Sequence, residues 1–69
     1  MVLIFGKDGC PYTEAAREDY ERRKVPFEYL NVKKDRAALD RMLEFSHGER
    51  RVPVVVEGSK VTIGFDGGT

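Results

Sequence analysis

Apolar residues occur along this chain in short runs that alternate with amphipathic stretches. The run from Val2 to Phe5 is unbroken, as in a strand that is covered on both faces. Residues 27–32 are rich in aromatic and branched side chains and are predicted to form a second strand. Two further β-branched runs, 54–56 and 60–63, surround a glycine-containing turn and predict an antiparallel hairpin.

Two longer stretches have the spacing of amphipathic helices. The first runs from Pro11 to about Lys24 and ends at Val25-Pro26, because the residue before a proline avoids the helical conformation. The second is expected to begin after Asp35 as its N-cap and to end at His47-Gly48, where Gly48 can adopt the left-handed conformation. In the first helix, the residues expected to face the sheet are Tyr12, Ala16 and Tyr20, with Ala15 beside them. In the second helix they are Ala38, Leu39, Met42 and Leu43. On the exposed face of the first helix we expect two ion pairs, Glu18 with Arg22 and Asp19 with Arg23.

The order of these elements predicts an α/β domain that occupies residues 1–69. A strand, a helix and a second strand make a βαβ unit, whose two strands should pair in parallel. The 69 residues are barely enough for one complete domain. We therefore expect one small domain with little core to spare.

Composition and charge exclude several classes of function. The 12 basic and 12 acidic residues cancel, so the net charge gives no reason to expect a nucleic acid or an anionic membrane as partner. No apolar run approaches the roughly 20 residues of a membrane span, and the first five residues are too short for a signal peptide. A single cysteine without a targeting segment indicates a reducing, cytoplasmic setting.

Cys10 is the residue with the most distinctive chemistry. It lies between Gly9 and Pro11 at the start of the first predicted helix, where the missing N–H of a proline costs nothing. The free N–H groups and positive dipole end of the helix favour the thiolate, as does Lys7, whereas Asp8 opposes it. Cysteines in such places have pKa values roughly 1 to 5 units below the free value of about 8.5. We expect an ionised, accessible thiol; the alternative is a buried structural cysteine.

A Lys-x-x-Cys-Pro-Tyr motif after the first strand, followed about forty residues later by Val52-Pro53 before a strand, resembles the glutaredoxins of the thioredoxin superfamily. The resemblance covers nearly the whole chain and is greatest to small monothiol variants, including glutaredoxin-like proteins with selenocysteine at the position of Cys10. Dithiol members have a second cysteine where this chain has Thr13. The resemblance implies a thioredoxin-like β-α-β-α-β-β fold with a four-stranded mixed sheet, whose final helix is truncated because the sequence stops at Thr69.

The same resemblance implies a redox enzyme that works with glutathione. Because one cysteine cannot form an internal disulfide, a second thiol from outside must resolve any mixed disulfide. Cys10 would attack a glutathionylated protein, keep the glutathione on its own sulfur and release it to a second glutathione. The resemblance thus predicts a monothiol thiol-disulfide oxidoreductase with glutathione as co-substrate, no permanently bound cofactor, glutathionylated or disulfide-bearing proteins as partners, and a monomeric or weakly dimeric assembly.

The resemblance also implies that the Val52-Pro53 peptide bond is cis and lies against Cys10. A cis bond turns the chain sharply and leaves the backbone of Val52 free to pair with an extended peptide such as glutathione. Without the final helix, part of one sheet face would lack its cover, which favours self-association or lowers stability. The implied glutathione-binding residues are Lys7 and Arg51 for the glycyl carboxylate, Tyr12 as a wall of the groove, Val52 and Pro53 for the cysteinyl part, and Asp66 and Gly67 for the γ-glutamyl end.

Several residues keep a second interpretation. Thr13 is either a hydrogen-bond donor to the sulfur or an ordinary first-turn residue, and Tyr12 either walls the groove or packs inward. Arg51 reaches a carboxylate or is solvated, and His47 is a helix-end residue in water or a catalytic base. For the whole protein, one alternative is an iron–sulfur carrier, in which two protomers each supply Cys10 and one glutathione to a [2Fe–2S] cluster. The other is a redox-inert docking module.

Overall fold

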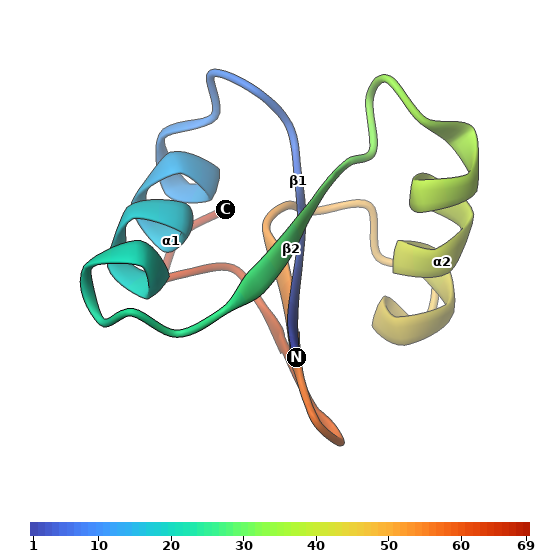
Figure 1. Cartoon of the computed structure of the whole chain (residues 1–69). Helices are drawn as coiled ribbons and strands as arrows, with labels where there is room; N and C mark the ends of the chain where they lie inside the picture. The colour runs from blue at the N-terminus through green and yellow to red at the C-terminus, as the bar shows by residue number, and fades with distance from the viewer.

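The computed structural model describes residues 1–69, which form four strands and two helices around one sheet. The elements are β1 (Val2–Gly6), α1 (Pro11–Arg22), β2 (Phe27–Asn31), α2 (Arg36–Ser46), β3 (Val54–Glu57) and β4 (Lys60–Ile63). The helices α1 and α2 lie on opposite sides of the sheet (Figure 1). This order confirms the predicted α/β arrangement. Neither helix has the length and apolar character needed to cross a membrane.

The sheet is mixed and has the strand order β2-β1-β3-β4. β1 and β2 are parallel, as predicted for a βαβ unit, and β3 pairs antiparallel with both β1 and β4. The predicted hairpin is therefore confirmed, with Gly58-Ser59 as its loop. β2 ends at Asn31 because the Asn31 side chain accepts hydrogen bonds from the backbone N–H groups of Lys33 and Lys34, which begins a turn.

The core consists of two layers, one on each face of the sheet. On the α1 side, Ile4 packs with other buried residues that include Tyr20 and Val55. On the α2 side, Phe5 packs with others that include Met42. Successive residues of a strand point to opposite faces, so a strand covered on both sides must be apolar throughout. This explains the unbroken apolar run of β1.

Helix α1 begins as predicted and ends slightly earlier than expected. Cys10 is its N-cap and Pro11 its first residue, but Arg23 is already the C-cap. Lys24 has a φ of 58°, and the N–H of Val25 donates to the carbonyl of Tyr20 at 2.9 Å. These features form a Schellman motif, which closes the helix before the proline is reached.

The face that α1 turns to the sheet differs from the predicted stripe. Thr13, Ala16 and Tyr20 are its buried residues, whereas Tyr12 is 41% exposed. Thr13, not Tyr12, lies in the inward stripe. The first turn of α1 packs so closely against Gly6, at the end of β1, that only a small side chain fits between them. The ion pairs also differ: Asp19 binds Arg23 as expected but binds Arg22 as well, so the predicted pair of Glu18 with Arg22 is wrong.

Helix α2 follows the prediction closely. The Asp35 side chain accepts the N–H of Ala37 at 3.0 Å, which confirms it as the N-cap. Ala38 and Met42 are buried, and Leu39 and Leu43 pack partly buried against the core. The C-cap in the left-handed conformation is His47, with φ 57°, and Gly48 follows with φ 88°.

The residues after β4 form a tight turn rather than a helix. The N–H of Phe65 donates to the carbonyl of Gly68 at 2.7 Å, and the N–H of Gly68 donates back at 3.0 Å. Asp66 and Gly67 make the bend with positive φ values of 54° and 83°. Gly64 joins this turn to the rest of the domain, because its N–H donates to the Pro53 carbonyl at 2.7 Å.

Candidate active site

Cys10 lies between the end of β1 and the first turn of α1. A turn at Gly9, which has a φ of 80°, brings the chain round to the helix, and the Cys10 carbonyl accepts the N–H of Glu14 at 2.9 Å. Cys10 itself has extended backbone angles, as an N-cap residue requires. Only 7% of its surface is exposed, so the thiol is less accessible than the sequence led us to expect. Its neighbours explain this burial, since Cys10 belongs to the cluster that includes Phe5 and Val52.

The first turn of α1 favours the ionised form of this thiol. Burial is the largest influence on the Cys10 thiol and raises its pKa, but the Thr13 N–H and hydroxyl, the Tyr12 N–H and the charge of Lys7 together lower the pKa below its ordinary value of 9.0. None of these donors forms a capping hydrogen bond of regular geometry with the neutral side chain. We therefore expect the donors to tighten around the sulfur when it becomes negative.

The Thr13 hydroxyl is an unusual feature of this turn. Thr13 is fully buried, and its Oγ1 has no hydrogen-bond partner. Leaving a buried hydroxyl unpaired costs about 1–3 kcal/mol. A donor without an oxygen or nitrogen acceptor, three residues after the N-cap cysteine, is suited to a sulfur anion. Of the two sequence interpretations of Thr13, this environment favours the donor.

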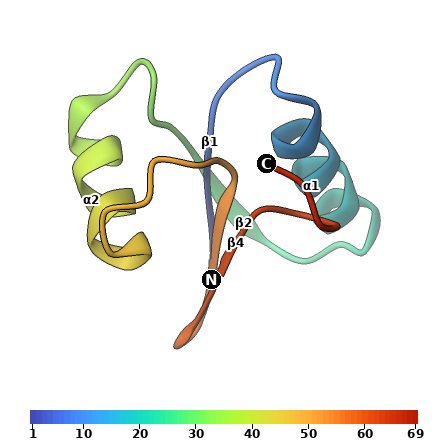
Figure 2. The ribbon, with the colours of Figure 1, turned by 180° about the vertical axis from the view of Figure 1, so that it is seen from behind.

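The Val52-Pro53 peptide bond is cis, as predicted. The segment that carries it crosses near the carboxyl end of β1 before entering β3 (Figure 2). Pro53 is fully buried, and Val52 lies in the same buried cluster as Cys10. The N–H and carbonyl of Val52 make no hydrogen bond to another backbone group. The structure thus combines the cysteine with a short stretch of unpaired backbone.

The two predicted cationic groups are both exposed. Lys7 directly precedes Asp8 in the turn and acts on Cys10 through its charge. Arg51 precedes the cis bond, and its Nε lies 3.7 Å from Glu49 Oε1, in a pair whose side chains are 62% and 48% exposed. Such an exposed, long pair contributes little to stability and leaves the guanidinium free to bind another anion.

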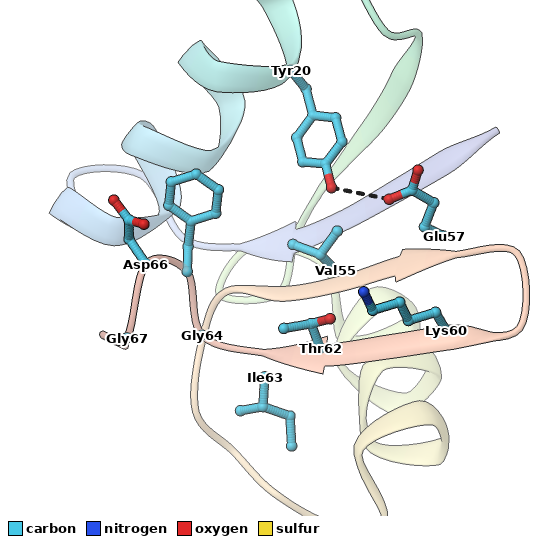
Figure 3. A pocket seen from close by; sticks show the side chains of 10 residues that line it. Tyr20, Val55, Glu57, Lys60, Thr62, Ile63, Gly64, Asp66 and Gly67 are labelled. Atoms are coloured by element: carbon cyan, nitrogen blue, oxygen red, sulfur yellow. Dashed lines mark hydrogen bonds between the residues drawn. The ribbon is translucent and has the colours of Figure 1, made fainter.

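Tyr12 meets the C-terminal turn. Gly68 lies so close to the Tyr12 ring that a β-carbon at residue 68 would overlap its atoms. Asp66 and Gly67, at the bend of this turn, line a pocket of about 180 Å³ on the α1 side of β3 and β4. Figure 3 shows Asp66 and Gly67 at one end of this pocket and the Tyr20–Glu57 hydrogen bond, 3.2 Å long, at the other. Asp66 and Gly67, the residues predicted to bind the γ-glutamyl end of glutathione, therefore line this pocket.

Two contacts near the site have no counterpart in the sequence interpretation. One is the close contact of Gly68 with the Tyr12 ring, and the other is a hydrogen bond of 2.9 Å from the Tyr29 hydroxyl to Asp8. Both join residues far apart in the chain, so only the order of strands could have indicated them. The structure contains no group of three or more His, Cys, Asp or Glu side chains that could hold a metal ion.

Comparison with known proteins agrees with this geometry. A family model described as Glutaredoxin matches residues 2–61. Among solved structures, a glutaredoxin from Archaeoglobus fulgidus is 30% identical, with a TM-score of 0.83 over 94% of this chain and 75% of its own. The thioredoxin-like protein BC3987 is 29% identical, with a TM-score of 0.84 over 96% and 89%. No curated protein sequence matches the chain.

A third similar structure is the glutaredoxin-like protein NrdH-redoxin from Escherichia coli, whose description gives it a thioredoxin-like activity profile. It is 28% identical, with a TM-score of 0.79 over 93% of this chain and 82% of its own. The fold and the site thus define a redox protein of the thioredoxin-like class. Within that class, the chain belongs to the glutaredoxin family.

Proposed function

We propose that this protein is a monothiol thiol-disulfide oxidoreductase that reduces mixed disulfides between glutathione and proteins. The observation that carries the proposal is the position of Cys10, the one cysteine of the chain, at the N-terminus of α1 and beside the unpaired backbone of Val52. A thiol whose pKa is lowered below its ordinary value is ionised to a greater extent near neutrality.

The reaction requires two exchanges. In the first, the Cys10 thiolate attacks the glutathione sulfur of a mixed disulfide; a new Cys10–glutathione disulfide forms, and the protein thiolate leaves and takes up a proton. In the second, the thiolate of a free glutathione attacks the glutathione sulfur held on Cys10. Oxidised glutathione leaves, and the Cys10 thiolate is regenerated with no net change in the enzyme.

An extended peptide is held in this scheme by backbone pairing and charge. The free N–H and carbonyl of Val52 would bind the cysteinyl part of glutathione as an added strand does, with Pro53 fixing their direction. Lys7 and Arg51 would bind the glycyl carboxylate. Tyr12, which is 41% exposed, would form a wall of the groove. Asp66 and Gly67 would receive the γ-glutamyl end.

This proposal gives the protein no resident cofactor, because the electrons pass only between sulfur atoms. Its partners would be glutathione and glutathionylated or disulfide-bearing proteins, in a reducing compartment such as the cytoplasm. Only the thiol, its helix and the proline loop are needed for the first exchange. The second exchange depends on which external thiol reaches the mixed disulfide.

The test is reduction of a glutathionylated protein by purified wild-type chain, with Cys10→Ser as the inactive control. Mass spectrometry should detect one glutathione on wild-type protein after exposure to oxidised glutathione, and its removal by free glutathione. Replacing glutathione with thioredoxin reductase and NADPH separates the proposed reductant from the kind of activity described for the NrdH-redoxin. An adduct that only the reductase system removes would overturn the role of glutathione; the absence of any adduct would overturn the proposal.

A further inference from the structure

The carboxylate of Asp8 is held by two groups from the far side of the active-site turn. The Tyr29 hydroxyl, on β2, donates to its Oδ1 at 2.9 Å. The Lys34 ammonium, in the turn after β2, lies 3.4 Å from its Oδ2. Both oxygens of Asp8 are therefore engaged toward β2, the edge strand on one side of β1.

Cys10 belongs to a different part of the core from Tyr29. It packs in the cluster that includes Val52 and Val54. Tyr29 belongs to the layer on the α1 face, whereas the cluster of Cys10 belongs to the α2 face. The contacts of Asp8 thus direct its carboxylate toward Tyr29 and Lys34, although Asp8 and Cys10 are only two positions apart in the chain.

We propose that Tyr29, assisted by Lys34, is a positioning residue that holds the Asp8 carboxylate away from the Cys10 thiolate. This inference rests on the proposed function, which requires that thiolate. A carboxylate free to approach the sulfur would disfavour the negative sulfur by charge repulsion. At a separation of about 6 Å in a largely aqueous setting, that repulsion lowers the thiolate fraction at neutral pH about three- to tenfold.

Tyr29 is itself fixed in place by helix α1. The Arg17 guanidinium lies over the Tyr29 ring, 3.9 Å from its centroid, and pairs with Glu14 at 3.0 Å. Glu14 in turn lies 3.5 Å from the N–H of Gly9, in the same turn as Asp8. The contacts of Asp8 with Tyr29 and Lys34, which we call the Asp8 clasp, are therefore part of a network that joins the active-site turn, α1 and β2.

Few charged groups face Asp8, Tyr29 and Cys10. Lys34 and Arg17 face Asp8, Arg17 and Glu14 face Tyr29, and Lys7 faces Cys10. The hydrogen bond from Tyr29 lowers the pKa of Asp8, and Lys34 lowers it further. Burial, followed by the bond to Asp8, raises the pKa of Tyr29 to about 12. The carboxylate and the phenol thus keep their charge states throughout the pH range in which the thiol titrates.

The test is the pH dependence of Cys10 alkylation by iodoacetamide in four proteins: wild type, Tyr29→Phe, Asp8→Asn and the double variant. Tyr29→Phe should raise the apparent thiol pKa and slow alkylation at pH 7 about three- to tenfold. Asp8→Asn removes the charge and should not raise it. The double variant should behave as Asp8→Asn does, because no carboxylate remains to be released.

These outcomes separate charge positioning from a merely structural role. Asp8→Asn keeps an oxygen that can accept from the Tyr29 hydroxyl, so if the hydrogen bond only stiffens the turn, Tyr29→Phe should raise the thiol pKa in the Asp8→Asn background as well as in wild type. That result, or an unchanged Tyr29→Phe, would overturn the inference. Lys34→Ala, at a residue with a 76% exposed side chain, should shift the pKa in the same direction as Tyr29→Phe and keeps the test available if that variant does not fold. Tyr20→Phe, which removes a hydroxyl bonded to Glu57 instead, is the matched control and should leave the thiol pKa unchanged.

The wild-type measurement separately tests the proposed function. A wild-type thiol pKa near the ordinary value would refute the activated thiolate itself. A low wild-type pKa with no response to Tyr29→Phe would refute only the role of the clasp.

Discussion

Thr13 packs its side chain against the α-carbon of Gly6, where a β-carbon would lie only 2.7 Å from Thr13 Oγ1. This contact fastens the first turn of α1 to the last residue of β1. Because Cys10 lies between these two residues, the contact also sets how far the cysteine can move. Gly6 is the last residue of β1, and its missing side chain has a packing role.

Replacing Gly6 by alanine should destabilise the fold. The added methyl group must displace the fully buried Thr13, and overpacking of this kind costs about 1–3 kcal/mol. Urea unfolding of Gly6→Ala, Thr13→Ala and the double variant measures the effect. Removing the Thr13 side-chain branches should relieve the overlap, so the double variant should lose less than the sum of the two single losses. Additive losses would contradict this explanation.

Replacing Thr13 by valine should impair the thiol without impairing the fold. Valine has nearly the same shape but no hydroxyl, and the hydroxyl has no oxygen or nitrogen partner to lose. If the hydroxyl stabilises the thiolate by a charge-assisted hydrogen bond, alkylation of Cys10 at pH 7 should slow about tenfold. Thr13→Ser keeps the donor and should retain most of the rate. Equal rates for the valine and serine variants would exclude Thr13 as the donor.

The lowered pKa of Cys10 should also appear in the stability of the protein. A thiol whose pKa is lower in the folded than in the unfolded chain stabilises the fold when it is ionised. This contribution is fully present above the ordinary value of 9.0, and it is lost as the pH falls through the lowered folded value. The free energy of unfolding of wild type relative to Cys10→Ser should therefore rise with pH up to about 9 and then level off. A constant difference between pH 5 and 9.5 would count against a lowered pKa.

Replacing Gly68 by alanine should displace the Tyr12 ring and weaken substrate binding selectively. The new methyl group would overlap the Tyr12 ring, whereas the donors to the thiol are the backbone N–H of Tyr12 and the N–H and hydroxyl of Thr13, not the ring. We expect the KM for a glutathione mixed disulfide to rise about threefold or more, because the groove wall moves, with little change in alkylation by iodoacetamide. In a Tyr12→Ala background the same substitution should have no further effect on KM. A further increase there would show that Gly68 acts through another contact.

Local chemistry was enough to predict much of this protein. The alternation of elements, the Asp35 cap, the parallel βαβ pair and the hairpin all follow from short-range patterns, and the structure confirms them. The same holds for Cys10 at a helix N-terminus, because Gly9 and Pro11 fix the backbone on both sides of it. The cis Val52-Pro53 bond came from the family resemblance and is also present.

Other features depended on how the elements pack. Periodicity predicted Tyr12 in the inward stripe of α1, but the packing of the helix against Gly6 buries Thr13 there instead. The clasp between Asp8 and Tyr29 depends on a strand register, which brings together residues that are 21 positions apart. The sequence by itself determined where the reactive sulfur lies along the chain, because turns and caps involve neighbouring residues. Only the tertiary structure decided which distant groups surround that sulfur, because those contacts depend on the sheet order and on the direction of each packed side chain.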